Sequence, residues 1–203
     1  MSTREQASAA RRRQILDAAL RSFEENGVEG TTVADVRRLS GASVGSIYHH
    51  FGGKEELASA LYLEAVCDYQ RGLLRVLRAD PEAEAGIRAL VRHHVRWVRD
   101  NPALARYLLS RREPPSDELR EQNREALAAT GGWLRAQVEA GRVRRLPLDL
   151  YLTIMIGPAQ EFARQWLAGR VKSSIGRAER VLAEAAWRAL RADRASGGGS
   201  PPA

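Results

Sequence analysis

Residues 31–57 constrain this chain more than any other segment, because they encode two short helices separated by a tight turn. Thr32 is a favourable N-cap and Asp35 follows three residues later, which is a short form of the capping box. Gly41 tolerates the positive φ that a turn between two helices commonly requires. The segment therefore predicts a helix-turn-helix, whose second helix enters the major groove of duplex DNA while its predecessor crosses the backbone.

The second helix of this motif is predicted over residues 43–50, with a serine as its N-cap. Its larger apolar and aromatic residues are expected to form a buried stripe, namely Val44, Ile47, Tyr48 and Phe51. Small residues allow a helix to approach the base edges closely. The candidates for base contacts are therefore Ser43, Val44, Gly45 and Ser46.

A family resemblance rests on the residues SGASVGSIYHHFGGKEEL and on the upstream stretch RRRQILDAALRSFEENGVEGTTVADV. Together they closely resemble the N-terminal domain of tetracycline-repressor-like (TetR family) transcription regulators. The chain departs from the family pattern at Arg37 and Ser40, where the family usually carries small alanines, and at Gly53, where a polar cap is common. A glycine cap is only a few tenths of a kcal/mol poorer than a serine or asparagine cap, so the helix that follows is expected to form.

The resemblance implies that three side chains contact the DNA backbone, namely Tyr48, His49 and Lys54. Thr32, whose amide and hydroxyl stand at a helix start, is assigned a further phosphate contact. Two alternatives stay open at this point, since Tyr48 can be a core aromatic and Ser43 can be an N-cap alone.

The charge of the chain agrees with a polyanionic partner, because the formal net charge is +7 and the pI is near 10.3. This charge is spread out, however. Residues 1–55 hold eight Lys or Arg against seven Asp or Glu. The prediction of double-stranded DNA as a partner therefore depends on the motif and not on bulk charge.

Helical periodicity without sustained strand alternation predicts an all-α protein of about nine helices. Residues 1–53 are expected to form a three-helix DNA-binding domain whose first helix covers residues 9–26. Residues 54–194 are expected to form a larger helical domain for ligand sensing and dimerisation, with helix 54–78 linking the two. Asp80 is predicted to cap the next helix, with Pro81 in its first turn. The tail, residues 195–203, is expected to be disordered.

The last two long helices are hydrophobic and rich in alanine, which favours a dimerisation face. The resemblance implies that they pair across a two-fold axis in a homodimer, and symmetry then predicts a palindromic operator. The alternative is that these helices only complete the core of the monomer.

The larger domain is expected to bind a small apolar or aromatic effector in a cavity between helices. The resemblance implies repression that this ligand relieves by shifting helix 54–78 and so changing the separation of the two recognition helices. Aromatic and polar residues at helical spacing are the candidates for the pocket, although each is also an ordinary core residue. They are His94, Trp97, Tyr107, Trp133, Met155, Phe162 and Trp166.

Other classes of protein fit the sequence less well. The pattern G-x-S-x-G at residues 41–45 follows a helix instead of the strand that a hydrolase requires. The two histidine pairs are adjacent and not four residues apart, so no metal site and no cofactor are expected. A single cysteine and the lack of a long apolar stretch predict a cytoplasmic protein that has no membrane partner. A helical scaffold and a transcriptional activator of the same fold remain alternatives to a repressor.

Overall fold

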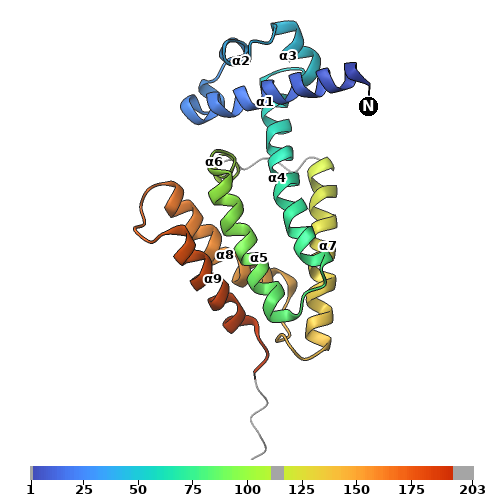
Figure 1. Ribbon diagram of the computed structural model, residues 1–203, viewed down its shortest axis with the longest axis vertical. Coiled ribbons are helices and arrows are strands. Elements are labelled where there is room, and N and C mark those ends of the chain that lie inside the picture. The colour runs from blue at the N-terminus through green and yellow to red at the C-terminus, as the bar shows by residue number, and fades with distance from the viewer. Residues whose placement is uncertain (1, 111–116, 194–203) are drawn as a thin grey trace, which may run out of the picture. The chain divides into compact units, whose positions relative to one another are not determined.

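The computed structural model of this chain describes residues 2–110 and 117–193, except for the side chain of Gln122. The described residues form nine helices, and the only strand-like pairing among them is an isolated bridge (Figure 1). The all-α prediction is confirmed. The expected disordered tail at residues 195–203 lies outside the described residues. The helices are α1 Thr3–Gly30, α2 Val33–Ser40, α3 Val44–Phe51, α4 Lys54–Arg78, α5 Ala83–Asp100, α6 Pro102–Ser110, α7 Asp117–Glu139, α8 Leu148–Leu167 and α9 Ile175–Leu190.

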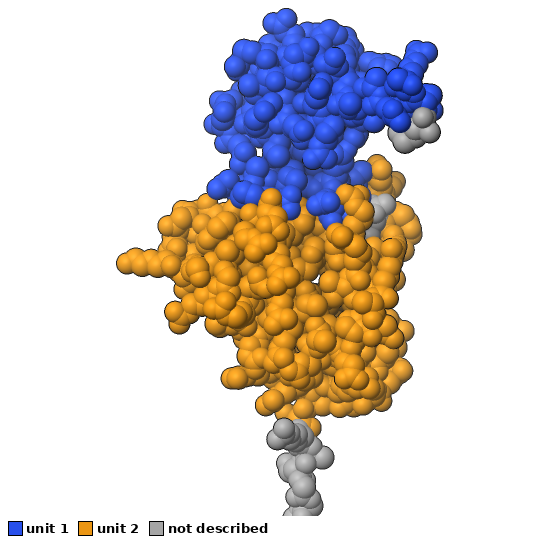
Figure 2. Space-filling view, viewed as in Figure 1, with its two compact units in different colours: residues 1–68, 101–116 blue, residues 69–100, 117–203 orange. Residues whose placement is uncertain are grey.

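The helices divide into two compact units, which Figure 2 shows in different colours. Unit 1 comprises residues 1–68 and 101–116, and unit 2 comprises residues 69–100 and 117–203. This division differs from the expected boundary after residue 53. The first half of α4 buries Leu57 and Leu61 in the core of unit 1, so this half belongs with the N-terminal helices. Helix α4 therefore carries residues of both units.

The first helix is longer than the sequence predicted, because a capping signal lies further upstream. The Ser2 side chain accepts a hydrogen bond from the Glu5 amide, and the Glu5 carboxylate accepts one from the Ser2 amide. This capping box starts α1 at Thr3. Within α1, Ile15 and Leu16 are buried in the core of unit 1.

The turn between α2 and α3 forms as the sequence predicted. The hydroxyl of Thr32 accepts from the Asp35 amide, and the Asp35 carboxylate accepts from the Thr32 amide, which completes the capping box. Gly41 ends α2 with a φ of +64°. Ser43 then caps α3.

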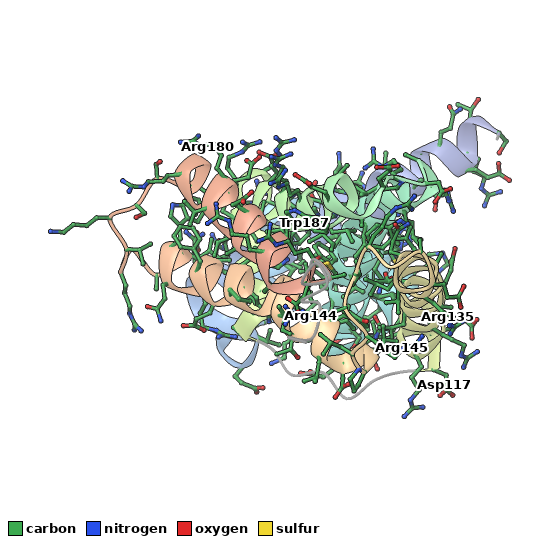
Figure 3. The ribbon with its side chains drawn as sticks, turned by 90° about the horizontal axis from the view of Figure 1, so that it is seen from below. Asp117, Arg135, Arg144, Arg145, Arg180 and Trp187 are labelled. Atoms are coloured by element: carbon green, nitrogen blue, oxygen red, sulfur yellow. The ribbon has the colours of Figure 1, made fainter. Side chains whose placement is uncertain are left out.

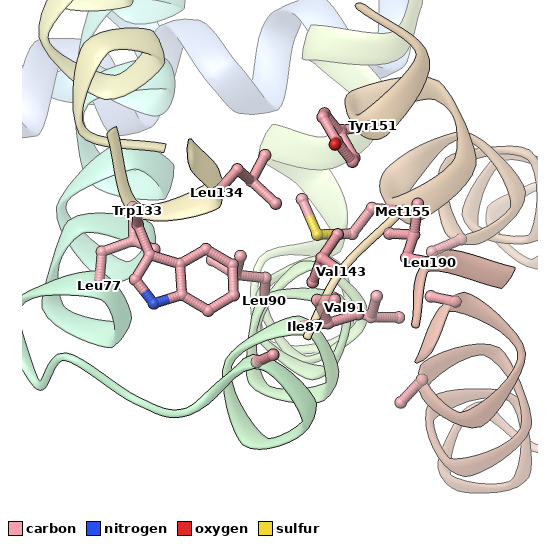
Figure 4. Packing of buried hydrophobic residues seen from close by; sticks show 14 of the residues in the cluster. Leu77, Ile87, Leu90, Val91, Trp133, Leu134, Val143, Tyr151, Met155 and Leu190 are labelled. Carbon is pink, nitrogen blue, oxygen red and sulfur yellow. The ribbon is translucent and has the colours of Figure 1, made fainter. Parts of the chain in front are cut away.

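The core of unit 2 is built by α5 together with side chains from α7, α8 and α9 (Figure 4). The ring of Trp133 packs against Gly86, where an added Cβ would lie 2.2 Å from that ring. The indole of Trp133 donates a hydrogen bond of 3.0 Å to the Pro81 carbonyl. Close packing of α5 against α7 therefore depends on a glycine. Other core members are Ile87, Leu90, Val91, Leu134, Met155 and Leu190.

The start of α5 corrects one prediction. Asp80 does not cap α5, because its amide donates to the Leu77 carbonyl and its φ is +43°. Asp80 therefore belongs to the turn that ends α4, and α5 begins at Ala83. No described helix is both long and apolar enough to cross a membrane.

Candidate functional site

Helix α3 presents one face to solvent and packs the other into unit 1. Ile47 is fully buried and Phe51 is 7% exposed, whereas Val44 is 44% and Tyr48 is 51% exposed. The prediction that Val44 and Tyr48 belong to the buried stripe is therefore wrong. Val44 is the first residue of the helix, and Tyr48 lies about 100° around the axis from Ile47, so neither faces the core.

The exposed face of α3 brings the base-contact candidates together. Ser43, Val44 and Gly45 are exposed at the start of the helix, and Ser46 is half-buried beside them. The Ser43 hydroxyl accepts a hydrogen bond of 3.1 Å from the Ser46 amide, so it acts as an N-cap. Tyr48 and His49 are exposed further along the same helix. Uncharged and mostly small side chains therefore cover this surface at the start of α3, and the hydrogen-bonding side chains of Tyr48 and His49 cover it further along the helix.

Thr32 and Lys54 stand at the starts of two other helices of unit 1. The Thr32 hydroxyl is exposed and donates to the Asp35 carboxylate at 2.6 Å. This bond lowers the pKa of Asp35. The Lys54 ammonium donates to the Glu29 carbonyl at 3.3 Å and lies 3.9 Å from the Glu55 carboxylate. A phosphate at Lys54 would compete with these two protein oxygens.

Cations from α1 gather at the C-terminal end of α3, which the sequence did not reveal. The Arg12 guanidinium lies 5.2 Å from the centre of the Phe51 ring and pairs with the Glu64 carboxylate. Burial lowers the pKa of His50, and the charges of His49, Arg12 and Arg11 lower it further. The spacing of residues within one helix does not indicate this cluster, because the cluster forms only where α1 packs against α3.

The seven predicted pocket residues do not form one site. Tyr107 lies in the core of unit 1, where its hydroxyl donates to the Ala58 carbonyl at 2.7 Å and its ring stacks on Phe23. Trp133 and Met155 are buried in the core of unit 2. The structure therefore separates Tyr107 from the other candidates. The remaining four are His94 and Trp97, buried on α5, and Phe162 and Trp166, half-buried on α8.

A groove of about 450 Å³ lies among α4, α7 and α8 of unit 2. None of the seven candidates lines it. Tyr69, Gln70 and Asn123 do, and the Gln70 amide donates to the Asn123 amide oxygen at 2.7 Å. The sequence analysis did not identify these amides, because the groove forms only where three helices meet.

Two of the predicted residues reach this groove through Tyr69. The Tyr69 hydroxyl and the His94 Nδ1 are hydrogen-bonded at 3.1 Å, and the Trp97 ring lies edge-on to Tyr69 at 5.5 Å. Burial, and to a smaller extent the charge of His93, lower the pKa of His94 from 6.5 to about 4. His94 is therefore a neutral imidazole at neutral pH. Its Nε2 is buried and has no hydrogen-bond partner within the part of the chain that the structure describes.

Comparisons with known proteins agree with the geometry of α2 and α3. A family model described as bacterial regulatory proteins of the tetR family matches residues 15–61. HTH-type transcriptional repressor Rv1474c of Mycobacterium tuberculosis is 37% identical over 161 residues, which cover 73% of this chain and 79% of that protein. HTH-type transcriptional repressor AcnR of Corynebacterium efficiens is 43% identical over 79 residues, which cover 35% of this chain and 42% of AcnR.

Solved structures share the fold over most of the chain. A TetR family regulator from Marinobacter aquaeolei superposes with a TM-score of 0.79 at 19% identity, covering 93% of this chain and 100% of that one. FadR from Bacillus subtilis, solved with stearoyl-CoA, has a TM-score of 0.71 at 21% identity and covers 85% and 96% of the two chains. Because the helix-turn-helix is present and the mycobacterial repressor is similar over most of its length, the chain belongs to the TetR family and is a DNA-binding transcription regulator.

Proposed function

We propose that this protein is a repressor that binds a palindromic operator as a homodimer and leaves it when a small molecule binds unit 2. The exposed face of α3 carries this proposal. It presents small residues, Ser43 to Ser46, toward base edges and the hydroxyl of Tyr48 toward a phosphate. Thr32, His49 and Lys54 are proposed to hold further phosphates on either side of the same groove.

The proposed homodimer uses α8 and α9. Large apolar side chains are exposed on both helices, with Val181 of α9 at 56% and Leu150 of α8 at 43% exposed. Phe162 and Trp166 are half-buried one helical turn apart on α8. Burial of such side chains between two copies supplies the apolar area that a stable interface needs. A two-fold axis then presents two α3 helices to half-sites about 34 Å apart.

The proposed effector site is the groove beside Tyr69 and Gln70. Both residues lie on α4, which carries residues of both units. A ligand that changes the hydrogen bond between Gln70 and Asn123 changes how α4 is held against α7. A coupling free energy of about 1 to 3 kcal/mol between the two sites is enough for a regulatory response.

The DNA contacts are tested first, by selecting bound sequences from random duplexes and measuring affinity for the selected duplex across a salt series. We expect an inverted repeat, bound by two chains, with an affinity that falls steeply as salt rises. Tyr48→Phe should weaken binding about tenfold, the loss of one hydrogen bond to a charged group. Tyr62→Phe, which removes a hydroxyl from α4 of the same unit, is the matched control.

Two results would contradict this proposal. One is equal binding to the selected and to scrambled duplexes, which would leave α3 without a role in specificity. The other is unchanged affinity in Tyr48→Phe, which would remove the phosphate contact assigned to its hydroxyl. The dimer is tested separately by Val181→Asp, which should shift the protein toward a monomer in sedimentation and weaken operator binding at the same time.

A further inference from the structure

The groove beside Gln70 has an interior without formal charge. Its apolar wall is formed by α4, α7 and α8. All twelve described residues that line it are uncharged at neutral pH, and burial raises the pKa of the Tyr69 phenol, which keeps it neutral. A charged group deep in this groove would lose its hydration without gaining a counter-charge, so the groove favours an apolar chain. The apolar wall comprises Leu73, Ala126, Leu127, Leu152 and Ile156.

A second hollow, of about 680 Å³, lies along α7 beside Leu148 at the start of α8 and is lined by charged residues. Three arginines line it, Arg120, Arg124 and Arg135, and no carboxylate is among its described lining residues. Their spacing, with Leu127 and Gly131 between them, places all of them along one face of the helix. We call this hollow the arginine trough. Figure 3 shows Arg135 on α7 at the edge of the helices of unit 2.

The arginines of the trough are available to an anion. Arg120 pairs with Asp117 at 2.5 Å and Arg124 pairs with Glu121, each on the same helix and each strongly exposed. Exposed pairs of this kind contribute little and exchange partners readily. No hydrogen bond or ion pair of the Arg135 guanidinium is found among the described residues. The trough therefore carries an excess of positive charge that a bound anion can neutralise.

The two hollows are adjacent, because Asn123 and Leu127 line both. Leu127 is 44% exposed at this junction. The Gln70–Asn123 amide pair stands on the groove side of the same junction and offers both donors and acceptors to an uncharged polar group. An apolar surface, a neutral polar pair and a cationic surface thus lie side by side around α7.

We propose that the effector is an amphiphilic anion, whose apolar chain fills the groove and whose phosphate or carboxylate head lies in the arginine trough. An ester, amide or thioester linkage of such a molecule passes the Gln70–Asn123 pair. This inference rests on the proposed ligand response of unit 2 and names the chemical class of its ligand. This arrangement also explains why an uncharged groove can take a charged ligand, since the anionic head of the ligand lies outside the groove, in the solvent-exposed arginine trough.

The class is tested by calorimetric titration of the full-length protein with three probes of one chain length, dodecyl phosphate, dodecanol and dodecyltrimethylammonium, below their micelle-forming concentrations. We expect dodecyl phosphate to bind at least tenfold more tightly than dodecanol, and the cation to bind least. Each methylene removed from the phosphate probe should weaken binding about fourfold if the chain is buried. Dodecanoate and dodecanoyl-CoA then distinguish a carboxylate head from a phosphate-bearing thioester.

The junction residue supplies a matched pair of variants. Leu127→Asn and Leu127→Asp remove the same apolar side chain from an exposed position, and only the second adds a carboxylate between groove and trough. Dodecyl phosphate should bind at least tenfold more weakly to L127D than to L127N, whereas dodecanol should bind both alike. The double variant Arg124→Ser with Arg135→Ser should weaken the binding of the anionic probes only. The double variant Arg75→Ser with Arg170→Ser, at two other exposed arginines, should change the affinity for neither the anionic probes nor dodecanol.

Equal affinity for the three probes, or an unchanged phosphate affinity in the trough variant, would overturn the proposed ligand class. Operator binding without ligand is measured on the same preparations and separates this failure from failure of the proposed function. If the protein binds its operator but no amphiphilic anion releases the protein from the DNA, the proposed ligand class is wrong and the proposed DNA-binding function is retained. If it binds no operator, the proposed function fails whatever the probes do.

Discussion

His94 should make the stability of this protein depend on pH in a way that a single substitution removes. The imidazole is 8% exposed and hydrogen-bonded to the Tyr69 hydroxyl, and its pKa falls from 6.5 to about 4 because burial disfavours the charged form. The folded pKa is lower than the unfolded one, so the unfolded chain binds more protons between these two values. The free energy of unfolding therefore falls as pH falls through this range.

The size of the effect follows from the two pKa values. At about pH 7.5 His94 is neutral in both states and contributes almost no pH dependence. At about pH 5 the unfolded histidine is almost fully protonated while only about a tenth of the folded molecules carry this proton, which corresponds to a loss of about 2 kcal/mol. For a protein with a typical stability of about 5 to 15 kcal/mol, this loss is readily measured.

Urea unfolding at the two pH values, at one protein concentration, tests this reasoning. Other groups also titrate between them, so the informative quantity is the difference between the wild type and a variant that cannot titrate at this position. His94→Gln should lower the pH-dependent loss by about 2 kcal/mol, whatever its effect on stability at neutral pH. His93→Gln is the comparison variant at the neighbouring position, because the charge of His93 is only the smaller cause of the lowered pKa of His94. An equal pH dependence in the wild type and H94Q would refute the assignment of a buried neutral imidazole.

Three substitutions in unit 1 test its local structure by denaturant unfolding and operator binding. Thr32→Ala should cost about 1 kcal/mol because it removes the N-cap of α2, and Thr32→Ser should restore most of it. Gly41→Ala should cost about 1 to 2 kcal/mol from backbone strain alone, since φ is +64° and an added Cβ meets nothing within 4 Å. Tyr107→Phe should cost about 1 kcal/mol through the lost bond to the Ala58 carbonyl, and stability equal to wild type would exclude that bond from the folded state.

The helix-turn-helix could be predicted from the sequence because its determinants are local. Thr32 and Asp35 are three residues apart, and Gly41 fixes the turn by its own backbone freedom. Such signals depend on neighbours within one helical turn, which a sequence displays directly. The wrong prediction at Asp80 also has a local cause. Aspartate is a common N-cap residue, but the Asp80 amide donates to the Leu77 carbonyl, so Asp80 lies in the turn that ends α4.

The ligand groove could not be predicted in the same way, because its walls come from three helices far apart in the chain. Aromatic residues were chosen as candidates, and packing placed them elsewhere. Tyr107 stacks on Phe23 in unit 1, and Trp133 fills the space over Gly86. Periodicity indicates which face of a helix is buried, but it does not tell which buried face leaves space between helices. That space is defined only when α4, α7 and α8 are packed together, with Gln70 and Asn123 among its lining residues.

The position of Tyr69 gives the two sites a physical connection. It lines the groove, it bonds to His94, and it follows directly on residue 68, the last residue of α4 that packs with unit 1. Helix α4 is continuous through this point, so a displacement of Tyr69 by a ligand cannot be absorbed by a loop. A packed helix shifts as a unit because its backbone hydrogen bonds are kept. Tyr69→Phe should therefore reduce the factor by which the ligand weakens operator binding, and the factor by which the operator weakens ligand binding should fall equally, since coupling between two binding sites is reciprocal.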